Sequence, residues 1–111
     1  MTQISYADFE KVDMRVGKIT RVEDFPRARK PAYKLWIDFG PLGIKQSSAQ
    51  ITQRYGKDEL MGRLAIAVVN FPPRQIANFM SEVLVLGVVL GNNDVVLIQP
   101  NSEVSLGKRI L

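Results

Sequence analysis

Residues 31–40, "PAYKLWIDFG", contain the most regular alternation of apolar and polar side chains in the chain. A period of two residues predicts a β-strand with one face in a core. The predicted core face consists of Tyr33, Leu35, Ile37 and Phe39. On the opposite face Lys34 lies beside Trp36, so a cation and a large aromatic surface are offered together. This pair suits stacking on a nucleobase, and the alternative is that Trp36 packs beneath a loop or against another subunit.

Segments rich in Val, Ile and Thr lie on both sides of this strand. Before it, residues 14–23 predict a first strand, and Ser5 is placed to cap a short helix in residues 5–13. After it the sequence predicts, in order, a strand at 44–51, a helical turn at 52–62, strands at 63–71 and 79–90, and a sixth segment at 94–100. Five strands with a helix after the third predict an all-β fold with short helices, a five-stranded barrel of the oligonucleotide and oligosaccharide binding (OB) type.

The length of 111 residues fits one domain. We therefore expect a single OB-type domain at 1–111, with residues 1–12 as an N-terminal extension and residues 91–111 as a C-terminal dimerisation segment. The apolar runs at 64–69 and 83–90 exceed what half-buried strands of a small barrel require. A homodimer formed through the C-terminal strands would cover them, and the alternative is that the barrel alone buries them.

The chain contains no cysteine and no histidine. Their absence excludes disulfides, thiol nucleophiles, zinc sites of the usual type and a histidine base. The carboxylates are scattered among basic residues, as on a solvated surface, and no glycine-rich phosphate loop is present. We expect no enzyme, no catalytic or metal-binding residues and no cofactor. Because the N-terminus lacks the pattern of a signal peptide and no apolar run is long enough to span a bilayer, we expect a cytoplasmic protein without membrane insertion.

The formal net charge is +4, and the densest basic segment is "RARKPAYK", residues 27–34. It contains no acidic residue, and its cations are Arg27, Arg29, Lys30 and Lys34. Such a cluster suits nucleic-acid phosphates or another acidic partner. A solvated basic loop without a ligand is the alternative.

Residues 68–87, "VVNFPPRQIANFMSEVLVLG", carry aromatic, proline and methionine side chains in what would otherwise be a connection. Methionine adapts to irregular ligands, aromatic rings supply contact area, and prolines stiffen a loop. We expect an apolar crevice that binds polypeptide through Trp36, Phe71, Pro72, Phe79, Met80 and Leu84. The alternative is that Phe71 and Phe79 are ordinary core residues at strand ends.

The segments "FEKVDMRVGKI", "YKLWIDFG", "GRLAIAVVNF" and "FMSEVLVLG" resemble the tRNA-binding domain family, a dimerising OB-fold module, over residues 9–111. The resemblance implies RNA contacts at Ser47, Ser48, Asn70, Arg74 and Ser81, together with Arg27, Arg29, Lys30 and Lys34 of the basic loop. Two positions of the family's signature have changed, to Val83 and Leu84, which leaves a stiffer apolar wall.

The segments "RKPAYKLWIDFG", "IKQSSAQIT" and the stretch at 68–87 are closer to a branch of this family that acts as a chaperone in protein export. This resemblance implies a non-enzymatic homodimer that binds unfolded or presecretory polypeptides in an apolar crevice, with the export machinery as a further partner. The alternative it implies is a tRNA-binding protein that uses the OB-fold face. An accessory subunit of a larger enzyme is a third possibility.

Overall fold

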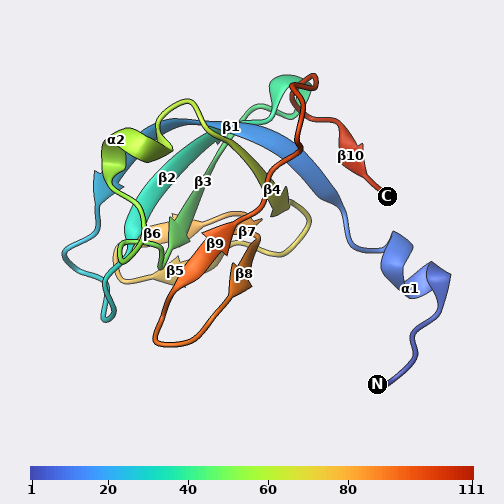
Figure 1. Cartoon of the computed structure of the whole chain (residues 1–111), viewed down its shortest axis with the longest axis horizontal. Coiled ribbons are helices and arrows are strands. Elements are labelled where there is room, and N and C mark those ends of the chain that lie inside the picture. The colour runs from blue at the N-terminus through green and yellow to red at the C-terminus, as the bar shows by residue number, and fades with distance from the viewer.

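The computed structural model describes residues 1–111 and consists mainly of β-strands around one barrel (Figure 1). Helix α1 (Tyr6–Glu10) lies on an N-terminal arm that stands away from the barrel. The Ser5 hydroxyl accepts a hydrogen bond from the Asp8 N–H at 3.0 Å, and the Asp8 carboxylate accepts one from the Ser5 N–H at 3.4 Å. This capping box confirms the helix start predicted at Ser5.

The main sheet has six strands. Five follow the order β3-β2-β1-β4-β7, and β10 pairs with β1. Their bounds are β1 (Met14–Asp24), β2 (Tyr33–Asp38), β3 (Ile44–Ala49), β4 (Leu64–Val68), β7 (Leu84–Val85) and β10 (Arg109–Ile110). The short helical segments η1 (Gly40–Leu42) and α2 (Lys57–Leu60) flank β3 in the chain. The strand order and the helix after β3 confirm the predicted OB-type barrel.

Side chains and a single backbone bond nearly close the barrel where β3 meets the segment before β7. The Glu82 N–H donates to the Gln46 carbonyl at 2.8 Å. The Ser47 hydroxyl donates to the Val83 carbonyl at 2.9 Å. The Gln46 N–H donates to the Glu82 carboxylate and the Ser48 N–H to the Ser81 hydroxyl, each at 3.0 Å. No strand ladder joins these two edges, so the barrel has a seam here.

The inward face of β2 forms the centre of the core, as its alternation predicts. Leu35 and Ile37 are fully buried, with Ile19 of β1 and Phe39 against them. Gly17 lets β1 approach β2 closely, because a Cβ there would lie 2.5 Å from Ile37 Cγ2. Burial of these side chains is the main stabilising contribution to the barrel.

Two two-stranded sheets extend the barrel: β5 (Arg74–Ile76) with β6 (Phe79–Ser81), and β8 (Gly87–Val89) with β9 (Val95–Leu97). The prediction of a single strand at 79–90 was wrong. This stretch forms three short strands that pair with different partners: β6 with β5, β7 with β4 and β8 with β9. The connection at 71–78 also proves to be half of a hairpin, which Ala77 turns with a φ of +51°. None of the helices is long and apolar enough to cross a membrane.

Candidate functional site

A groove of about 710 Å³ lies between the end of β3, the β5–β6 hairpin and the segment from β7 to β9. Its apolar lining includes Ile51, Phe71, Pro72, Ile76, Val83, Leu84, Val85, Val89, Val95 and Leu97. Polar side chains join the lining at Ser48, Gln50, Arg74, Ser81 and Glu82. A long apolar surface with few polar groups can hold an apolar ligand and orient it.

The groove brings together residues that the sequence predicts for two different ligands. Phe71, Pro72 and Leu84 come from the predicted polypeptide-binding set. Ser48, Arg74 and Ser81 come from the predicted RNA-binding set. The side chain of Arg74 is exposed and forms no ion pair, so it offers a free cation beside the apolar wall.

The other side of the β5–β6 hairpin covers an aromatic cluster of Phe25, Trp36 and Phe79. The Phe79 ring lies 5.5 Å from that of Phe25 and 5.9 Å from that of Trp36, both in edge-on geometry. Arg21 lies over Trp36, with its Cζ 4.6 Å from the ring centroid. Trp36 is therefore half-buried beneath the β5–β6 hairpin, which is close to the packed position that the sequence left open as the alternative for this residue.

Phe79 does not line the groove as the sequence predicts, since only 6% of its surface is exposed and it belongs to a small core with Phe25 and Ala32. The turn at Ala77 folds β6 back so that Phe79 faces the barrel. Met80, its neighbour, points the other way and is 43% exposed, but it lies outside the groove lining.

The basic residues lie close to this aromatic cluster rather than in the groove. Lys34 Nζ is 5.0 Å from the ring centroid of Phe25 and 5.4 Å from that of Phe79. Arg27, Arg29 and Lys30 are exposed on the loop that joins β1 to β2. Their cationic groups could meet phosphates beside the hairpin without entering the groove.

Two residues of the predicted RNA-binding set form hydrogen bonds that hold parts of the fold together, one of them buried (Ser47) and the other exposed (Asn70). Ser47 is completely buried, and its hydroxyl donates to the Val83 carbonyl. The Asn70 side chain accepts from the Asp13 N–H at 3.0 Å and donates to the Lys11 carbonyl at 2.7 Å. Asn70 therefore ties the N-terminal arm to the end of β4, and the Ser47 hydroxyl stabilises the seam of the barrel.

Two ion pairs fix neighbouring segments, one beside the groove and one at the N-terminal arm. Arg54 donates two hydrogen bonds to Asp94, at 2.8 and 2.7 Å, which holds the β8–β9 loop against the turn before α2. The hydrogen bond from Arg54 lowers the pKa of Asp94. At the arm, Arg15 donates to Asp13 at 2.6 Å, and this bond lowers the pKa of Asp13 against the opposing effect of burial.

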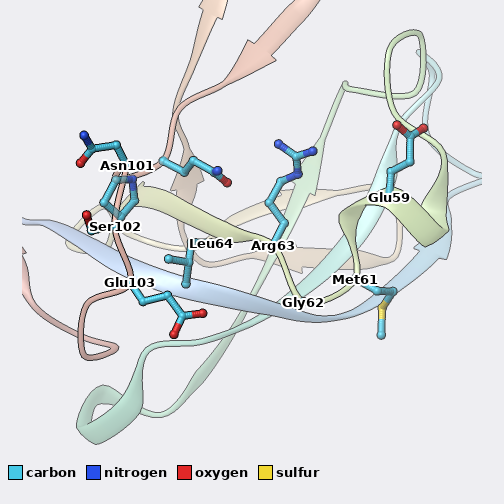
Figure 2. A pocket seen from close by; sticks show the side chains of 10 residues that line it. Glu59, Met61, Gly62, Arg63, Leu64, Asn101, Ser102 and Glu103 are labelled. Carbon is cyan, nitrogen blue, oxygen red and sulfur yellow. The ribbon is translucent and has the colours of Figure 1, made fainter.

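A second pocket, of about 440 Å³, lies between the end of α2 and residues 99–103 (Figure 2). Arg63 projects between Glu59 on one side and Asn101 and Ser102 on the other. This pocket is mainly polar, and the sequence predicts none of its residues as a site. No group of three or more Asp or Glu residues is placed to hold a metal ion.

The chain is similar to known proteins both in sequence and in fold. The family model described as "Putative tRNA binding domain" matches residues 14–109. The methionine–tRNA ligase of Thermococcus onnurineus is 36% identical over 107 residues, which cover 96% of this chain. The chain spans only about 14% of that ligase's length.

Two solved structures resemble the whole chain. The chaperone CsaA of Bacillus anthracis has a TM-score of 0.95 and 53% sequence identity, covering 99% of this chain and 100% of that one. The CsaA chaperone protein of Picrophilus torridus has a TM-score of 0.92 and 56% identity, covering 98% of this chain and 100% of that one. The family model and these full-length matches lead to one conclusion: the chain belongs to the tRNA-binding domain family and is similar to its CsaA chaperones.

Proposed function

We propose that this protein is a non-enzymatic chaperone that binds unfolded or presecretory polypeptides in the apolar groove. The observation that carries the proposal is the groove itself, an apolar surface flanked by strands and a proline-stiffened hairpin. The two CsaA chaperones that match the whole chain support it. A role in export within the cytoplasm, with the export machinery as a partner, is part of the same proposal.

The groove sets the expected strength of binding. Burial of a few hundred Å² of apolar peptide surface contributes about 25 cal/mol per Å², or several kcal/mol in total. Association and ordering costs offset much of this gain. We expect a Kd of about 1 μM or weaker, with little dependence on salt because the contacts are mainly apolar.

We also propose that two copies form a homodimer. The β8–β9 hairpin exposes Val88 and Leu90, each by about half, on the outside of the barrel. An exposed apolar face of this kind is typical of an interface between subunits. A dimer would also present two grooves to one unfolded chain and so raise the avidity.

tRNA binding is the second candidate, and the free cation of Arg74 in the groove favours it specifically. Ser48 and Ser81 lie in the same lining, and the basic loop at 27–30 lies near the other face of the hairpin. If RNA occupies this surface, the affinity falls steeply as salt rises, because phosphate contacts release counterions.

The test titrates the protein into a fluorescein-labelled apolar peptide, and separately into labelled bulk tRNA, at about 50 and about 200 mM salt. Anisotropy of the label is the readout, since Trp36 is packed away from the groove. Phe71→Ser should weaken peptide binding at least fivefold. Leu42→Ser, which removes a similarly exposed apolar side chain far from the groove, is the matched control. Tight, salt-sensitive tRNA binding without a peptide signal would overturn the chaperone proposal.

A further inference from the structure

The segment from Val83 to Leu90 has one paired edge and one open edge. The Leu86 N–H donates to the Ile66 carbonyl at 2.8 Å, and the register pairs Leu84 with Val68 and Val85 with Ala67. In an antiparallel ladder, hydrogen-bonded pairs alternate with pairs that exchange no bond. Since Leu86 is bonded to β4, Val85 turns its N–H and carbonyl to the opposite edge.

The same parity continues into β8. The Leu90 N–H donates to the Asp94 carbonyl at 2.9 Å, and the register pairs Val89 with Val95. Gly87 and Val89 therefore direct their N–H and carbonyl groups away from β9, to the same edge as Val85. Between residues 84 and 90, the backbone groups of the even-numbered residues therefore form hydrogen bonds, first with β4 and then with β9. The backbone groups of the odd-numbered residues 85, 87 and 89 point to the other edge, where no strand pairs with them.

This open edge lies in the groove. Val85, Gly87 and Val89 all contribute to its lining. The edge starts where the Ser47 hydroxyl donates to the Val83 carbonyl, the last hydrogen bond between β3 and this segment. Beyond that point the lining of the groove includes Ala49 and Gln50 at the end of β3 and Val85 on the other side. From Val85 to Val89 the edge extends about 13 Å at the usual rise of a strand.

We infer that an extended segment of a client polypeptide binds here by strand addition along residues 85–89. Backbone hydrogen bonds would supply affinity without regard to sequence, and apolar side chains at alternate positions would face the groove wall. This inference rests on the proposed chaperone function and names the binding mode of the same site. The free cation of Arg74 adds a preference for a segment that carries an acidic residue.

A second copy of this chain is a poorer occupant of the groove. A twofold interface must be self-complementary. The unpaired edge alone meets that condition, but the concave walls beside it would face each other across a void in a pair of copies. The even-numbered residues Val88 and Leu90 remain available for contact between copies.

The experiment measures amide hydrogen exchange by NMR on the intact protein, free and saturated with an octapeptide in which leucine alternates with serine and one serine is replaced by aspartate. The Val85 amide should exchange fast in the free protein and at least tenfold more slowly in the complex. The Leu86 amide, already bonded to β4, is the internal control and should be slow in both states.

Two versions of the octapeptide, methylated on the backbone nitrogens of alternate residues, complete the test. Strand addition predicts that at least one version loses tenfold or more in affinity, because methylation removes the donors on one edge. Equal affinity of all three peptides, or Val85 protection that appears with protein concentration alone, would overturn the inference. If the unmethylated peptide fails to bind at all, the proposed function itself is wrong.

Discussion

At the scale of single residues, two phenylalanines in one stretch have opposite environments. Phe71 is 52% exposed on the groove, whereas Phe79 is 6% exposed between Phe25 and Trp36. Phe79→Ala should lower the free energy of unfolding by about 3 kcal/mol, because it removes a ring from a packed cluster. Phe71→Ala should change it by less than about 0.5 kcal/mol. Urea denaturation of both variants measures the difference, and equal effects would contradict these assignments.

The residue scale also shows where prediction from sequence stops. Phe71 and Phe79 both follow an asparagine in the same proline-containing stretch, so no local pattern separates them. Their difference arises because Ala77 adopts a positive φ and folds β6 back over the aromatic cluster. The hydrogen bonds of Asn70 could not be predicted from the sequence either, because its partners Lys11 and Asp13 lie almost sixty residues earlier in the chain.

At the scale of elements, the pair of Arg54 and Asp94 should make the β8–β9 wall sensitive to acid. The folded state lowers the pKa of Asp94, so the stabilisation is present above its unfolded pKa of about 3.9 and is lost as pH falls through the lower folded value. Asp94→Asn should therefore lower Tm relative to the parent protein at pH 7, and the gap should narrow as the pH falls below the unfolded pKa of about 3.9. A gap that stays constant from pH 7 to pH 2.5 would count against this ion pair.

An element can be predicted from the sequence when local residues determine it, and cannot when pairing with distant strands determines it. Strand β2 was clear from the sequence because its alternation of buried and half-buried residues is local. The β5–β6 hairpin was missed, since Pro72 and Pro73 and a three-residue strand give no alternating pattern. The run at 79–90 shows high β-propensity throughout, but only tertiary pairing decides that its bonds pass from β4 to β9.

At the scale of the whole molecule, adjacent residues of β8 should separate dimerisation from ligand binding. Successive side chains of a strand point to opposite faces, so Val89 faces the groove and Val88 faces away from it. In a homodimer that uses the outer face, Val88→Glu should reduce the mass in analytical ultracentrifugation from that of two 12.5 kDa copies to that of one. The reason is that an interface cannot readily bury an unpaired carboxylate.

Val89→Glu is the matched substitution, with the same change in charge one residue along the chain. It should leave the mass of the dimer unchanged and weaken peptide binding at least tenfold, because the carboxylate would stand in the apolar groove. The peptide titration at about 200 mM salt tests this without interference from long-range charge effects. Loss of the dimer in both variants would place the interface in the groove itself, and the proposed division of the hairpin into an outer interface and an inner binding face would then be wrong.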